Sequence, residues 1–275
     1  MMALPAETRV LGGRRSSRMP ALHAEWTKLR TVPGPGWLLV VAVVLTATVG
    51  AIAAHAVSCP SGGCQIDPAK VSLSGIYLGQ AIVAIVAVTS VSGEYSTGMM
   101  RLTLTAVPRR WRVLAAKATV VGTVTLAAGA IAVLASMLTG RLLLYGNGMT
   151  PAHGYEAISL SAGPILRAAT GSMLYLVLIA LLGIGIATAV RDSATSIGLV
   201  LGLLYLFPLI TSVIGDPHVQ RHLNQISPMT AGLYIQATTN LRSLPLTPWQ
   251  GLGVLAAWSA GALLVGGLLL ALRDA

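Results

Sequence analysis

The sequence is poor in charge. Only 9% of its 275 residues are Asp, Glu, Lys or Arg and 55% are hydrophobic, whereas about 25% of the residues of a soluble domain are charged. This excludes an ordinary soluble protein and indicates a polytopic membrane protein. The formal charge of +10 comes from basic residues in short segments beside apolar runs, which is typical of orientation in a bilayer rather than of nucleic-acid binding.

Charged residues are also missing from the interiors of the apolar runs. A run needs about 20 residues to cross about 30 Å of hydrocarbon, and none of the candidate runs carries Asp, Glu, Lys or Arg away from its ends. His55, near the end of the first run, is the one ionisable candidate. A carrier driven by protons or sodium needs a carboxylate or a comparable relay within the membrane. The candidate runs are 37–57, 71–91, 115–139, 168–190, 194–213 and 251–272.

Nucleotide-binding and catalytic motifs are missing as well. A P-loop needs Gly-Lys-Ser/Thr to hold phosphates, but Lys28, Lys70 and Lys117 follow Thr, Ala and Ala. The chain has no His-Glu-x-x-His motif for zinc and no Gly-x-Ser-x-Gly elbow for a serine nucleophile. We therefore expect no catalytic residue, no bound cofactor and no metal in this chain.

The pattern predicts an all-α integral membrane protein with six transmembrane helices. Residues 1–36 would form a cytoplasmic tail and an amphipathic surface helix, and residues 37–275 the six-span domain. Leu22, Trp26 and Leu29 share one side of that surface helix. With the N-terminus in the cytoplasm, most of the 18 Lys and Arg fall on the cytoplasmic side. The positive-inside rule then assigns both termini of this plasma-membrane protein to the cytoplasm.

The chain has only two cysteines, Cys59 and Cys64, in the loop after the first run. In this topology the loop faces the oxidising side, and Pro60 and two glycines between the cysteines can tighten it. The spacing predicts a Cys59–Cys64 disulfide. Metal binding is the alternative, but two thiolates without a nearby His or carboxylate pair make a poor site.

Two pairs of glycines have the spacing of close helix packing. Gly75 and Gly79, and likewise Gly198 and Gly202, lie four residues apart and so share a helix face. We expect them to pack against neighbouring helices, with a pore-lining or dimer role as the alternative.

The segment between the fifth and sixth runs is long. The stretch 229–235 is too short to span, so a re-entrant or interfacial helix on the outer face is expected. His218 and His222 have zinc-ligand spacing, but no third ligand is near in sequence, so we interpret them as solvated loop residues.

The largest polar break on the cytoplasmic side is the stretch from Gly93 to Arg112. It contains one carboxylate, four arginines, two turn glycines and a proline. Its apolar residues, Met99, Met100, Leu102 and Leu104, should pack against a partner or the membrane edge.

Two motifs resemble the ABC-2 type permeases, the membrane subunits of ATP-binding cassette transporters, especially actinobacterial ones. The first is Glu25-Trp26-Thr27-Lys28-Leu29-Arg30-Thr31, just before the first run. The second is Glu94-Tyr95-Ser96-Thr97-Gly98 with Arg101, Leu104, Pro108-Arg109-Arg110 and Lys117. Their order, the six spans and the short helix before the last span extend the resemblance over nearly the whole chain.

The resemblance implies an alternating-access permease that works with a separate ATPase subunit. We expect an exporter or a lipid-handling transporter, because the membrane cavity would be apolar. Two ATPase copies would bind ATP and Mg. Two permease copies would pair, which we expect to be a homodimer, with a related permease as the alternative partner. The stretch from Glu94 would form the coupling helix, and the surface helix a second contact. Glu94 and Arg101, two turns apart, would present opposite charges along one docking face. The implied coupling residues are Glu94, Tyr95, Gly98, Arg101, Pro108, Arg109 and Arg110, with Glu25, Trp26, Lys28, Leu29 and Arg30 on the surface helix.

Alternatives stay open at this point. Arg109, Arg110 and Arg112 could instead be anchors to anionic lipid. A secondary transporter or channel would need a polar pathway through the runs. An integral membrane enzyme or a structural subunit would leave the stretch after Gly93 unexplained. The substrate is not indicated by any motif.

Overall fold

A computed structural model describes residues 25–28, 31, 33–57, 66–106, 110–147 and 163–272. All regular structure in these ranges is helical, and six helices are long and apolar enough to cross a membrane. The prediction of an all-α, multi-pass membrane protein is confirmed at this level. The six spans are α2 (Pro33–Ala56), α4 (Ile76–Ser96), α6 (Arg110–Gly146), α7 (Gly163–Val190), α8 (Ser193–Val213) and α11 (Pro248–Leu272).

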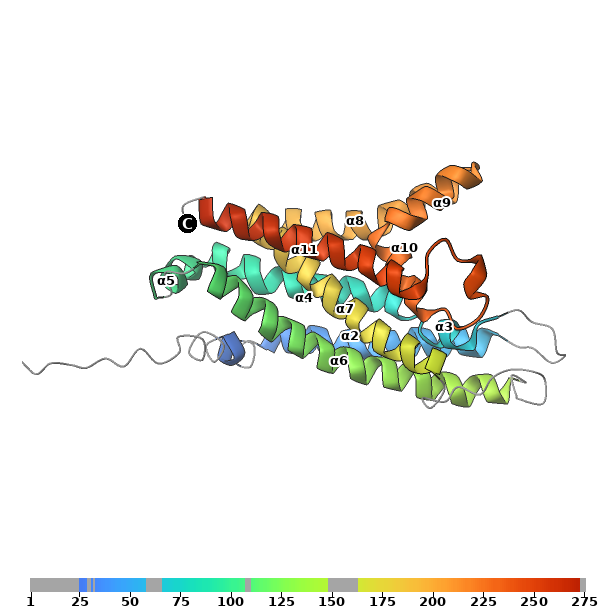
Figure 1. The fold of residues 1–275 in the computed structure, drawn as a ribbon. Coiled ribbons are helices and arrows are strands. Elements are labelled where there is room, and N and C mark those ends of the chain that lie inside the picture. Colours follow the sequence, from blue (N-terminus) through green and yellow to red (C-terminus); the bar gives the residue numbers. More distant parts are fainter. Residues whose placement is uncertain are drawn as a thin grey trace, which may run out of the picture.

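The six spans lie side by side with α7 in the middle (Figure 1), where it packs against α4, α6, α8 and α11. At one end, α4 ends and α6 begins, with the short helix α5 (Met99–Ala106) between them. We call this the charged end. The opposite end, called the loop end, carries short α-helices (Figure 1). These are α3 (Pro68–Ser72), α9 (Pro217–Ile226) and α10 (Pro228–Leu233).

The helix α6 is much longer than the predicted run 115–139. It has 37 residues, about 55 Å at 1.5 Å per residue, against about 30 Å of hydrocarbon. It therefore extends beyond the apolar layer at both ends. Hydropathy detects only the apolar middle of such a helix, and the helix continues because no proline interrupts it after Arg110.

The second span begins later than predicted. The run 71–91 starts inside a separate element, because α3 ends at Ser72 and α4 starts at Ile76. Asp67 caps α3, accepting hydrogen bonds from the amides of Ala69 and Lys70 at 3.1 and 3.2 Å. Apolar composition continues through this turn, so composition alone did not locate it.

The two glycine pairs have different surroundings. A Cβ atom at Gly75 would lie 1.9 Å from the carbonyl oxygen of Thr46, and one at Gly79 would lie 2.1 Å from the hydroxyl of Thr46. These two glycines let α4 approach α2 closely. By contrast, no described atom lies within 4 Å of a Cβ built at Gly198 or Gly202. The packing predicted for the second pair is not made within the described chain.

The segment between the fifth and sixth spans contains more helix than predicted. The short helix expected at 229–235 is present as α10, followed by a 3-10 turn at Tyr234–Gln236, and it packs against α11. The stretch with His218 and His222, predicted as loop, is the helix α9, which starts at the Asp216 cap. Both histidines are exposed, and the described residues contain no group of three metal-binding side chains.

Candidate functional site

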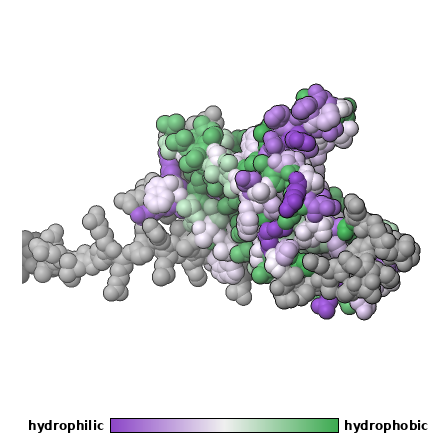
Figure 2. Space-filling view, turned by 45° about the vertical axis from the view of Figure 1, so that its right-hand side comes forward, coloured by the Kyte–Doolittle hydropathy of each residue, from purple (hydrophilic) through white to green (hydrophobic). Residues whose placement is uncertain are grey.

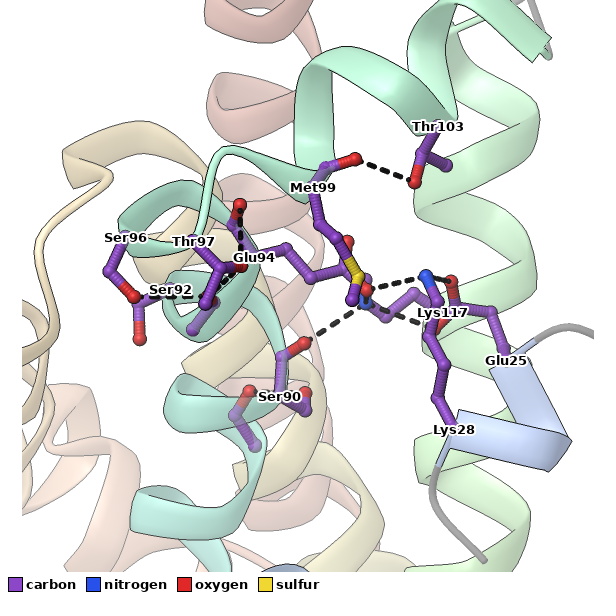
Figure 3. Close-up of polar contacts among 12 residues, drawn as sticks. Glu25, Lys28, Ser90, Ser92, Glu94, Ser96, Thr97, Met99, Thr103 and Lys117 are labelled. Atoms are coloured by element: carbon purple, nitrogen blue, oxygen red, sulfur yellow. Dashed lines mark hydrogen bonds and ion pairs between the residues drawn. The ribbon is translucent and has the colours of Figure 1, made fainter. Parts of the chain in front are cut away.

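Four charged side chains meet at the charged end, from three distant parts of the chain. Glu25 and Lys28 come from the helical residues 25–28, Glu94 from the end of α4, and Lys117 from α6 (Figure 3). We call these four residues the charge cluster. Their positions in the sequence are up to 92 residues apart.

Each lysine of the charge cluster bridges both carboxylates. Lys117 Nζ lies 2.9 Å from Glu25 Oε2 and 2.9 Å from Glu94 Oε1, and it also donates to the carbonyl oxygen of Ser90 at 2.9 Å. Lys28 Nζ lies 3.1 Å from Glu25 Oε1 and 2.8 Å from Glu94 Oε1. The charge cluster is therefore neutral overall, with two carboxylates and two ammonium groups.

The charge cluster is largely withdrawn from solvent. Glu25 and Glu94 are each 7% exposed, and Lys117 is 2% exposed. Moving a charge out of water costs several kcal/mol, and removing one member of a buried pair typically destabilises a protein by about 3–5 kcal/mol. Burial lowers the pKa of the Lys28 ammonium, but the carboxylates of Glu94 and Glu25 outweigh that effect and raise the pKa above its ordinary value. The charge cluster thus fastens residues 25–28 to the bundle.

Glu94 and Arg101 do not share a helix, so the predicted docking face with opposite charges two turns apart is wrong. The chain turns at Gly98, whose φ of 71° is accessible to glycine at little cost, and α5 begins at Met99 as a separate helix. Moreover, Glu94 is bonded to lysines inside the protein instead of being presented on the surface. The side chain of Arg101 lies outside the described residues.

Some large apolar side chains are exposed at this end. On α5, Met100 is buried at 3% exposure, whereas Leu102 is 71% exposed. Trp111, one residue into α6, is also exposed, with the Arg112 guanidinium 5.5 Å from its ring centre. Met100 attaches α5 to the bundle, so that Leu102 is held outward.

Two other predicted residues make contacts within the chain. The Arg110 guanidinium donates to the carbonyl oxygen of Leu270 at 2.7 Å, joining the start of α6 to the end of α11. The ring of Tyr95 lies 5.4 Å from the guanidinium of Arg191, in the turn between α7 and α8. Trp26 is half-exposed. Outside the described residues lie Leu29, Arg30, Pro108, Arg109, Cys59 and Cys64, so the predicted disulfide is not tested.

Sequence reasoning assigned no role to Lys117, the most buried member of the charge cluster. A signal existed, because Lys117 is the only lysine inside an apolar run and a buried lysine requires a carboxylate. Sequence reasoning also overlooked a neutral polar contact inside the bundle. The hydroxyl of Tyr175 donates to the side-chain oxygen of Gln80, and both side chains are fully buried.

Comparison of the chain with protein-family models and with curated proteins found no match.

Proposed function

We propose that this chain is the membrane subunit of an ATP-driven transporter and that a separate ATPase subunit docks at its charged end. The observation that carries the proposal is the charge cluster, which fastens a surface helix to α4 and α6 directly beside the exposed apolar residues of α5. An ATPase that contacts Leu102 would thus push on α5, which the chain connects to the two spans α4 and α6.

The connections of α5 are suited to pass on such a force. The turn at Gly98 joins α5 to α4, and Lys117 connects α4 to α6 through Glu94. The helix α6 continues unbroken to Gly146. Just beyond it, the side-chain amide of Asn147 donates to the carbonyl oxygens of Ala54 and Val57 at 3.1 and 3.0 Å. A displacement at the charged end would therefore reach the opposite end of the bundle.

The charge distribution supports the orientation that this function requires. Most of the 18 Lys and Arg flank the charged end in the sequence, which favours the cytoplasmic side for that end. The runs themselves carry no acidic residue away from their ends, so ion-driven transport lacks the usual coupling group. Energy from a separate ATPase is consistent with both features. In this proposal two copies of the chain, each with one ATPase, form an alternating-access exporter in the plasma membrane.

Co-purification tests the proposal. The tagged chain is expressed together with candidate ABC ATPase subunits from the same organism and extracted in mild detergent. We expect the ATPase to stay bound, and we expect Leu102→Glu to reduce the bound fraction by about tenfold or more, because it puts a charge into an apolar contact.

The matched control is Leu241→Glu, at an exposed leucine of the loop end, which should retain the ATPase. If no ATPase co-purifies, or if both variants bind it equally, the docking role of α5 is refuted. A secondary transporter or a membrane enzyme then becomes the better interpretation.

A further inference from the structure

A groove of 1190 Å³ separates α8 from α11, and α7 forms its floor. Its lining is apolar along the membrane-spanning part, including Leu182 on α7, Leu199 and Gly202 on α8, and Val265 on α11. A Cβ at Gly202 would have no described atom within 4 Å. The walls of the groove are apolar side chains and glycine backbone. An apolar chain therefore occupies the groove more favourably than water does.

The groove has a polar boundary at one end only. Gln225 and Ile226 of α9 line it at the loop end, and the Trp258 indole donates to the carbonyl oxygen of Ile226 at 3.0 Å. Arg221 and His222 lie one helical turn before Gln225 and Ile226, on the same side of α9, and both are exposed. Hydrophilic residues gather on α9, at the upper right in Figure 2, beside a surface of mixed hydropathy.

We propose that the groove holds an acyl chain of a bilayer phospholipid whose anionic headgroup lies at the α9 end of the groove. The lipid phosphate would lie beside Arg221. From Gly198 to Phe207 the groove follows α8 for about 14 Å, a length comparable to that of the acyl chains of one leaflet, about 15 Å. The apolar lining fits the chain, and the positive charge of Arg221 fits the phosphate.

A spanning helix of a second copy fits the groove less well. Such a helix is about 10–12 Å wide with its side chains, and it would meet α9 before leaving the bilayer, because Gln225 and Ile226 bound that end. An acyl chain does not meet this obstacle, because it ends at its headgroup before it reaches α9. The lipid site does not depend on the proposed transport function, because none of the groove-lining residues belongs to α5 or to the charge cluster.

The experiment uses the full chain, reconstituted with equal amounts of phosphatidylglycerol and phosphatidylcholine and extracted in mild detergent. Native mass spectrometry then counts the retained phospholipid. We expect retained phosphatidylglycerol in the unaltered chain and about a tenth of it in Gly202→Leu, whose side chain fills the groove. Arg221→Gln should lower the preference for phosphatidylglycerol over phosphatidylcholine about fivefold.

The control Gly253→Leu adds the same side chain on α11, at a glycine that is exposed, is outside the groove lining and has open space around its Cβ. It should retain lipid like the unaltered chain. Equal retention in Gly202→Leu and Gly253→Leu overturns the proposal. Photoreactive benzoylphenylalanine in place of Leu199 gives an independent measurement. A phospholipid adduct supports the lipid site, and a covalent dimer of two chains overturns it.

Discussion

The two ends of the bundle are held together by different chemistry. At the charged end, Glu25 and Glu94 are paired with two lysines, side chain to side chain, away from water. At the loop end, Asp67 accepts hydrogen bonds mainly from backbone amides. These include the amides of α3 and that of Thr239, at 3.1 Å, and Asp67 also accepts from the Thr238 hydroxyl at 2.7 Å.

The difference predicts unequal sensitivity. Removing or reversing one charge in the charge cluster leaves the opposite charges buried without a partner, and a buried charge cannot be rehydrated. Removing the charge of Asp67 leaves neutral amides at a partly exposed site, where water can replace some bonds. We therefore expect the charged end to be the more sensitive of the two to loss of one charge.

The largest effect is expected for charge reversal in the charge cluster. Glu94→Lys places three ammonium groups around Glu25, and the cost should be about 5 kcal/mol, at the upper end for a broken buried pair. Thermal unfolding in detergent measures it. Loss of ATPase binding in this variant would therefore reflect lost structure at the charged end, so Leu102→Glu is the better test of docking.

A swapped pair distinguishes charge from shape. The double variant Glu94→Lys with Lys117→Glu restores one opposite pair, and we expect it to unfold at a higher temperature than either single variant. Lys70→Glu, at an exposed lysine of α3, is the control and should change stability by less than about 0.5 kcal/mol. A double variant as unstable as the sum of its singles would refute the pairing of Glu94 with Lys117.

A smaller effect is expected at the loop end. Asp67→Asn keeps one acceptor oxygen but loses the charge that strengthens its hydrogen bonds, so the loss should be about 1–2 kcal/mol. Hydrogen exchange should rise at the amides of Thr238 and Thr239, with no change at the charged end. A loss as large as that of Glu94→Lys would remove the contrast between the two ends.

The smallest effect concerns pH. The pKa of Lys28 is raised above 10.5 in the folded chain, so its contribution is complete below that value and is lost as the pH rises through the folded pKa. Because the side chain is 31% exposed, solvent screening keeps this contribution below about 1 kcal/mol. Unfolding followed between pH 7 and pH 11 should show the difference between the unaltered chain and Lys28→Met disappearing only at the alkaline end. If the stability difference between the unaltered chain and Lys28→Met were already lost at pH 9, the raised pKa of Lys28 would be contradicted.

The spans were predictable because crossing a bilayer is a local demand on composition. About 20 apolar residues suffice wherever they occur, and all six helices were found from the sequence. Their ends were less predictable. The extension of α6 to Gly146 and the turn between Ser72 and Ile76 depend on caps and packing that hydropathy does not report.

The candidate site was predictable only in part. Glu25, Lys28 and Glu94 were selected through the family resemblance, but as surface contacts of an ATPase. That Glu94 points inward could not be derived, because its partners Lys28 and Lys117 are 66 and 23 residues away in sequence. The two glycine pairs were equally hard to distinguish from the sequence, because their spacing is identical. Gly75 and Gly79 pack closely against α2, whereas Gly198 and Gly202 border an open groove.

The sequence by itself determined that this is a six-span helical membrane protein, because hydrophobicity and helix length act over one segment at a time. Only the tertiary structure decided which charges neutralise one another and which apolar faces stay uncovered. Those outcomes depend on distances between segments that are far apart in the chain, and ion pairing and close packing both act only over a few ångströms.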